Sequence, residues 1–131
     1  MLTKSQVVVR YRDGRIVKGT TSNFVPARDG FHVQTPDGAV AEVSQAELKA
    51  LFFVRDLAGD PKRADTNEFS PKRPAPGRKI RVEFDDGEVI VGTTQGYQPN
   101  RPGFFVFPAD AASNNERCFV VTAATRRVHP L

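Results

Sequence analysis

The chain has 131 residues, 39% of them apolar, and a net charge of +4, enough for one ordinary domain or two very small ones. No stretch reaches the roughly 20 apolar residues that a membrane-spanning helix needs, and the early apolar run Val7–Val9 is too short for a signal peptide. We therefore expect no membrane insertion and a cytoplasmic location. With one cysteine, Cys118, and two histidines, we expect no internal disulfide, no metal and no cofactor.

The first half of the chain predicts five short strands, because apolar residues alternate in several short runs bounded by turn residues. In chain order, strands are expected at 7–11, 15–21, 30–35, 41–44 and 50–56, with one helical turn at 45–49. Asp13-Gly14 marks the first reversal, since glycine tolerates a positive φ. A two-residue turn would pair Tyr11 with Ile16, whereas a three-residue loop with a glycine bulge would shift the pairing by one residue. The sequence leaves both registers open.

The second half repeats the pattern of the first. A shift of 73 positions places Asp13-Gly14 on Asp86-Gly87 and Gly19 on Gly92, and after four extra residues the shift becomes 77, which places Val43 on Val120. The corresponding strands are expected at 80–84, 88–94, 103–108, 117–121 and 127–131, with a helical turn at 122–126. The repeat indicates a duplicated five-stranded unit.

These elements predict an all-β protein made of two tandem, similar, small five-stranded β-barrels, at 1–58 and 80–131. Residues 59–79 form the expected linker, GDPKRADTNEFSPKRPAPGRK. Within it, residues 61–79 hold six basic and two acidic residues, a net charge of +4, whereas 1–60 carry +1 and 80–131 carry −1. Its four prolines predict an extended, basic strap.

The strand–Asp-Gly–strand–Gly pattern over Val7–Val33 and Ile80–Val106 resembles the first half of the Sm fold, whose members bind RNA. The second signature of that fold has no counterpart in EVSQAELKALFFV, which restricts the resemblance to barrel shape. It implies single-stranded RNA binding as an alternative function, with the basic linker supplying the contacts: Lys62, Arg63, Lys72, Arg73, Arg78 and Lys79.

The stretch GYQPNRPGFFVFPADAASNNERCFVV, from Gly96 to Val121, resembles a bacterial domain family of unknown function. That family accompanies signalling receivers, PilZ domains that bind cyclic dinucleotides, and ATPases of secretion or pilus machinery. The resemblance implies an accessory module rather than a known reaction. The arginines of RPAPGRKIRVEF have the wrong spacing for a PilZ entry motif, so we assign no cyclic-dinucleotide site.

We expect no catalytic activity, because no catalytic triad pattern, phosphate loop or metal-ligand spacing occurs in the sequence. One polar cluster is conspicuous, namely Arg101, Asn114, Asn115 and Arg117. Its asparagines could hydrogen-bond the backbone and tolerate left-handed conformations. Alternatively, the cluster could recognise a carboxylate or phosphate.

Phenylalanines lie on both faces of some predicted strands, with Phe52 and Phe53 in the first half and Phe105 in the second. One face of such a strand fills a barrel, while the other must meet the second barrel, the linker or another protein. We favour the second barrel, because two small barrels in one chain need an interface. The sequence therefore predicts a non-catalytic adaptor for a protein partner, bound through an exposed strand edge or a Phe-rich face formed by these residues and the polar cluster.

Overall fold

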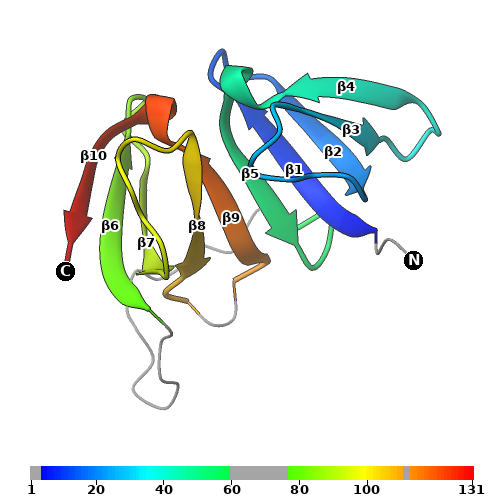
Figure 1. Cartoon of the computed structure of the whole chain (residues 1–131). Coiled ribbons are helices and arrows are strands. Elements are labelled where there is room, and N and C mark those ends of the chain that lie inside the picture. The colour runs from blue at the N-terminus through cyan, green and yellow to red at the C-terminus, as the bar shows by residue number, and fades with distance from the viewer. Residues whose placement is uncertain (1–3, 60–76, 111–112) are drawn as a thin grey trace.

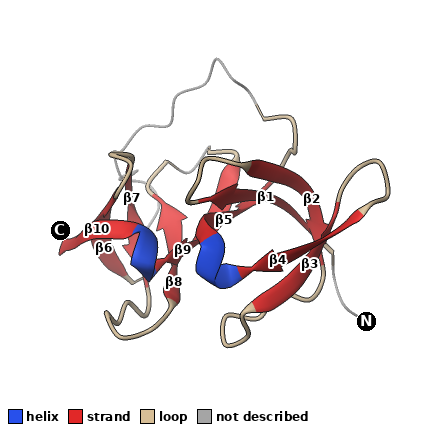
Figure 2. Cartoon of the chain, turned by 90° about the horizontal axis from the view of Figure 1, so that it is seen from above, coloured by secondary structure: helices blue, strands red, loops and turns tan. Residues whose placement is uncertain are grey.

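The computed structural model describes residues 4–59, 77–110 and 113–131, and these form an all-β structure, as predicted. Most of the expected linker, residues 60–76, lies outside the described residues. The elements are β1 Ser5–Tyr11, β2 Ile16–Thr21, β3 Gly30–Gln34, β4 Val40–Ser44, η1 Gln45–Glu47, β5 Leu48–Val54, β6 Arg78–Phe84, β7 Val89–Thr94, β8 Gly103–Pro108, β9 Asn115–Val121, η2 Thr122–Ala124 and β10 Thr125–Pro130. Both 3₁₀ turns, η1 and η2, lie at the top of the molecule as drawn in Figure 1 and near the middle of the view from above (Figure 2).

The strands of the described residues join in one 10-stranded antiparallel sheet, whereas the sequence predicted two tandem barrels packed together. The strand order is β10-β6-β7-β8-β9-β5-β1-β2-β3-β4. Figure 1 shows two curled halves that meet where β5 lies beside β9. The pairing runs from Ala50 opposite Val120 to Val54 opposite Asn115. Each five-stranded half ends in two outer strands, β10 and β9 in one half and β5 and β4 in the other. The sheet is continuous because β9 and β5 pair with each other through their unpaired edges.

The first hairpin adopts the three-residue loop, so the register is the shifted alternative. Tyr11 N donates to Arg15 O at 2.9 Å, and Gly14 N donates to Tyr11 O at 3.1 Å. Arg10 therefore pairs with Ile16. Gly14 has φ +97°, a left-handed conformation that L side chains rarely adopt. The hairpin between β6 and β7 has the same loop, with Gly87 in the position of Gly14.

Replacing Gly14 by Ala is expected to lower the free energy of unfolding by about 1 kcal/mol, because an L side chain is strained at this φ. No atom lies within 4 Å of the added Cβ, so the cost is conformational rather than steric. Chemical denaturation of the variant measures it. Gly30→Ala is the control, since its Cβ also meets open space but its φ is outside the positive region. An equal loss in both variants would contradict the role of the turn.

Two apolar clusters form the core, and each takes side chains from both halves of the chain. The first cluster is built mainly on β1, β3 and β5 but includes Phe119 and Val121 from β9. The second is built mainly on β6, β8 and β9 but includes Ala50, Phe52 and Val54 from β5. All seven residues of β5 are buried. Most of β5 and the second part of β9, residues 118–121, are therefore apolar on both faces, as is usual for strands covered on both sides.

A buried lysine adds an ionic contact across the junction between the halves. The side chain of Lys49, in β5, is only 9% exposed. Its Nζ lies 2.6 Å from Asp86 Oδ2, pairs with Glu88 Oε1, and sits 4.8 Å from the centre of the Phe84 ring. Lys49 belongs to the first half and the two carboxylates to the β6–β7 hairpin, so the contact ties one half to the other.

Candidate functional site: the open β4 edge

The phenylalanines predicted to form a binding face are largely enclosed by the fold. Phe52 and Phe53 are 5% and 6% exposed. Phe52 belongs to the second core cluster and Phe53 to the first, with Phe105 packed against the first from β8. The rings of Phe52 and Phe53 therefore do not present a free surface to a partner, and the prediction that they form a binding face is wrong. The junction between the halves accounts for the phenylalanines that exceed the needs of a single barrel.

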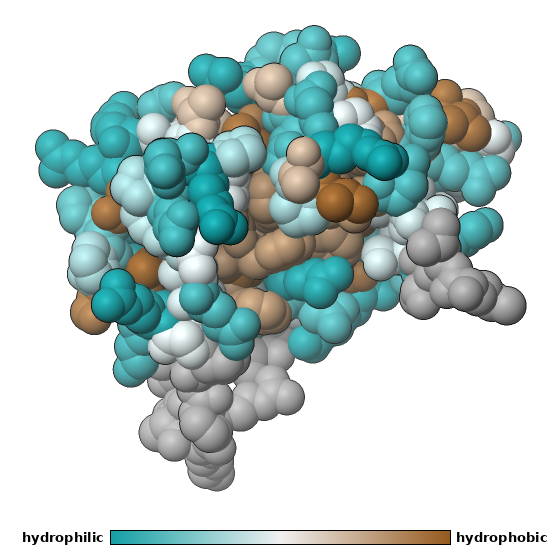
Figure 3. All heavy atoms as spheres, viewed as in Figure 1, coloured by the Kyte–Doolittle hydropathy of each residue, from teal (hydrophilic) through white to brown (hydrophobic). Residues whose placement is uncertain are grey.

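Three of the predicted site residues, Phe53, Phe105 and Arg117, do meet at this junction. The Arg117 guanidinium lies 4.4 Å from the ring centre of Phe53 and 5.3 Å from that of Phe105. Phe24 and Phe119 complete the aromatic group, with ring centres 5.1 Å apart. In Figure 3 brown and tan spheres line a hollow in the middle of this face, over the meeting of the two halves. The sequence signal for Phe24 was its alignment with Tyr97, which likewise packs on its own half's core.

The polar cluster divides into separate structural contacts. Asn114 Oδ1 accepts a hydrogen bond from Asp56 N at 2.9 Å, and Asn114 Nδ2 donates to Asp56 O at 2.8 Å. Arg101 Nε donates to Gln98 Oε1 within its own loop at 2.9 Å. Asn115 pairs with Val54 in the sheet. The backbone-bonding alternative therefore accounts for Asn114, whose side chain holds the end of β5 against the loop before β9.

The residues of the RNA hypothesis are only partly described. Lys62, Arg63, Lys72 and Arg73 lie outside the described residues, while Arg78 and Lys79 are exposed at the start of β6. RNA binding through this set stays a prediction.

Cys118 is fully buried in the second core cluster, and its burial raises the pKa of the thiol to about 12. The thiol is therefore protonated at neutral pH, which leaves it without the nucleophilic thiolate. Within the described ranges, no group of three or more His, Cys, Asp or Glu side chains could hold a metal ion. No helix in the described part of the chain is long and apolar enough to cross a membrane.

The two end strands of the sheet, β4 and β10, each pair on one side only, but β10 carries features that hinder further pairing. Arg126 and Arg127 are exposed on it. Leu131 N donates to Lys79 O at 2.9 Å, so the alternation of the ladder turns the nitrogen of Pro130 toward the outer edge. Proline has no N–H to donate, and edge charges and prolines hinder strand addition.

The outer edge of β4 has less protection, since the strand contains no proline and a single charged residue, Glu42. Next to the turn between β3 and β4, Thr35 N donates to Ala39 O at 2.9 Å. Hydrogen-bonded and non-hydrogen-bonded pairs alternate along an antiparallel ladder, so the peptide groups of Val40 and Glu42 point away from β3. Val40 is 63% exposed, and the side chain of Glu42 is 89% exposed. In Figure 1, β4 lies at the outer margin of the first half. Its edge offers hydrogen-bonding groups to an added strand.

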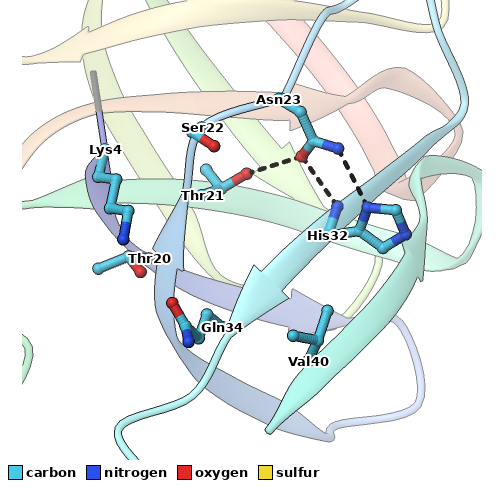
Figure 4. A pocket seen from close by; sticks show the side chains of 8 residues that line it. All are labelled: Lys4, Thr20, Thr21, Ser22, Asn23, His32, Gln34 and Val40. Carbon is cyan, nitrogen blue, oxygen red and sulfur yellow. Dashed lines mark hydrogen bonds between the residues drawn. The ribbon is translucent and has the colours of Figure 1, made fainter. Parts of the chain in front are cut away.

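A small pocket of about 270 Å³ lies beside this edge (Figure 4). It is lined by Lys4, Thr20, Thr21, Ser22, Asn23, His32, Gln34 and Val40. His32 faces Glu42 and Gln34 faces Val40 across the β3–β4 ladder, so these four side chains leave the same face of the sheet. We call the edge formed by Val40 and Glu42, together with this pocket, the β4 edge site.

Hydrogen bonds order the pocket. Asn23 Oδ1 accepts from His32 N at 3.0 Å, and Asn23 Nδ2 lies 3.2 Å from His32 Nδ1. With Nδ1 as the acceptor, the neutral ring carries its proton on Nε2, which lies 3.4 Å from Glu42 Oε1. The pocket thus offers hydroxyl, amide and ammonium groups together with the apolar surface of Val40.

In the described residues, the fold and the site together define an all-β, antiparallel chain with an open edge strand, β4, and an adjoining pocket. The chain belongs to a family of unknown function, DUF6982, whose model matches residues 3–131. No curated protein and no solved structure matches the chain significantly.

Proposed function

We propose that the protein is a non-catalytic adaptor, built from two similar five-stranded barrel units, that binds a protein partner by strand addition at β4. In this mode an extended segment of the partner continues the sheet, main-chain hydrogen bonds supply affinity, and neighbouring side chains supply specificity.

The equivalence of the two units is supported by their order of elements, which is four strands, a 3₁₀ turn and a fifth strand in both. Corresponding core positions are buried alike: Val9 and its counterpart Val82 are both 0% exposed. Both first hairpins also share one loop geometry. We attribute these features to an internal duplication.

The observation that carries the proposal is the junction itself. β9 is the fourth strand of the second unit, and its outer edge pairs with β5. The corresponding fourth strand of the first unit is β4, with Val40 and Glu42 at the positions of Arg117 and Phe119. This fold therefore already uses the outer edge of a fourth strand for pairing, and the same edge is open in β4.

The absence of catalysis is supported by the setting of the reactive groups. Asp13 lies in a hairpin, where it binds Arg15 at 2.8 Å, and Asp86 holds Lys49. His32 and His129 are about half exposed beside glutamates on the sheet surface. These groups are engaged in structural contacts and do not converge on one cavity.

The resemblance of Gly96–Val121 to a family that accompanies signalling and secretion proteins suggests where the partner acts. We expect it among bacterial signalling receivers, PilZ proteins or the ATPases of secretion and pilus machinery. A module that offers a sheet edge could dock such a protein without contributing chemistry of its own.

Replacing Val40 by Pro is expected to weaken partner binding about ten-fold, because the new ring removes one N–H donor from the open edge and leaves a carbonyl of the partner unpaired. The N–H of Val40 points away from β3, so the β3–β4 ladder keeps its hydrogen bonds. Affinity capture from cell lysate, quantified by mass spectrometry, compares the natural chain with this variant.

Val40→Thr is the matched control, since it keeps the donor and the β-branched shape. Proteins retained by the natural chain and by Val40→Thr but lost from Val40→Pro support strand addition. Equal retention by all three chains would contradict it, provided that thermal melts show that Val40→Pro is folded.

A further inference from the structure

We infer that the β4 edge site selects an extended partner segment with a lysine or arginine opposite Glu42 and an apolar residue on each side of it. This inference rests on the proposed function and names the chemistry of the partner. Its occupant is a segment of another protein rather than a second copy of this chain.

The β5–β9 junction supplies the register for such a segment. In that junction Leu51 lies opposite Phe119, while Ala50 lies opposite Val120. A shift of 77 residues converts Phe119 to Glu42 and Val120 to Val43. An incoming strand that follows the same register therefore places its central residue, in the position of Leu51, directly opposite Glu42.

The charge at this position has changed between the two units. Phe119 is 1% exposed and buried in the first core cluster, whereas the side chain of Glu42 is 89% exposed and lies 3.4 Å from His32. A leucine opposite Glu42 would cover a carboxylate with apolar surface and gain nothing from it. A lysine or arginine there would make a favourable cross-strand pair with Glu42.

The residues on either side of the basic residue point to the other face of the sheet. They lie opposite Ala41 and Val43, and Val43 is 2% exposed in the first core cluster. The corresponding junction residues, Ala50 and Phe52, are both apolar and buried. The pattern that fits β4 is therefore apolar, basic, apolar.

The β10 edge of a second copy of this chain does not fit the same register. Its β10 would have to take the place of β5, which puts Val128 opposite Glu42 and Arg127 opposite Val43. Arg127 would be buried beside the apolar core, and Pro130 would bring no N–H to its pairing with Val40. The outer edges of β4 and β10 therefore do not complement one another.

Fluorescence anisotropy with two labelled peptides tests the inference. Both copy β5, LKALFFV, one with Leu51→Lys and the other with Leu51→Glu. The natural chain is expected to bind the lysine peptide about five-fold more tightly than the glutamate peptide, and Glu42→Lys is expected to reverse the order. Because Glu42 is exposed, this variant is expected to fold, which a thermal melt checks.

Three results would overturn the inference. If both peptides bound the natural chain equally and neither bound Val40→Pro, the β4 edge would remain a binding site. The preference for a basic residue opposite Glu42 would be rejected. Failure of both peptides to bind at about 1 mM would reject the peptide pattern, while affinity capture with Val40→Pro decides on the edge separately. Sedimentation showing self-association that Glu42→Lys abolishes would assign the edge to a second copy.

Discussion

The double variant Asp86→Asn with Glu88→Gln is expected to lower the free energy of unfolding by about 3 kcal/mol. The cause is Lys49, whose side chain is 9% exposed and would be left as a buried charge without its carboxylates. Removing one side of a buried ion pair typically costs about 3–5 kcal/mol. Since Asp86 and Glu88 are 55% and 43% exposed, we expect the lower end of this range.

Lys49→Met is expected to change stability far less, because the two exposed carboxylates can return to water while methionine fills the space beside Phe84. Urea denaturation of the two variants measures this asymmetry. The matched control is Asp13→Asn with Arg15→Gln in the first hairpin, where the corresponding pair is 56% and 64% exposed and should contribute less than about 1 kcal/mol. If Lys49→Met and the double variant lowered the free energy of unfolding equally, the result would contradict the description of Lys49 as a buried charge.

The same contact makes stability depend on pH. The hydrogen bond from Lys49 to Asp86 lowers the pKa of that carboxyl below its ordinary value of 3.8. The folded chain therefore binds the Asp86 proton less readily than the unfolded chain does, and the contribution is fully present only above the unfolded pKa. It is lost as pH falls below about 3.8 through the folded pKa, and we expect Asp86→Asn to remove this part of the acid dependence.

Phe119→Ala is expected to destabilise the fold severely, with a loss of about 3–5 kcal/mol in the free energy of unfolding. Phe119 is 1% exposed, and its ring centre lies 5.1 Å from that of Phe24 and 5.2 Å from that of Phe105. Because a second-half residue fills the first-half core, both halves should lose stability together in a single transition. Calorimetry and near-ultraviolet circular dichroism measure it.

Phe107→Ala provides the comparison, since Phe107 lies in the neighbouring strand β8 but is only partly buried. Its loss should be clearly smaller than that of Phe119→Ala. The two halves could instead unfold in separate transitions, with Phe119→Ala shifting only the transition of the second half. That result would contradict a core shared between the halves.

The sequence alone located the strands and the hairpins, because these depend on local patterns. Alternating apolar residues assigned Val7 and Val9 to the buried face, and Asp-Gly placed the first reversal of each half. The last strand of each half begins two residues earlier than predicted, at Leu48 and Thr125, since the 3₁₀ turns before them need only three residues.

The candidate site was only partly accessible to such patterns. An exposed strand edge was predicted in general terms, but not which strand supplies it, and Asn23, His32 and Glu42 were not among the predicted site residues. The signal available was the exchange of apolar for polar residues between aligned strands: Phe105 corresponds to His32 and Phe119 to Glu42. That exchange indicates an open edge only when the neighbours of the two strands in the sheet are known.

Composition and alternation determined by themselves that this protein is built from β-strands, and that side chains such as Val7 and Val9 are buried. Tertiary structure decided that β5 pairs with β9, that Lys49 meets two acids across this junction, and that β4 stays open. The reason is physical: alternation specifies which face of a strand is buried but not its neighbour in the sheet, and pairing between Ala50 and Val120 depends on how two separately curled halves fit together.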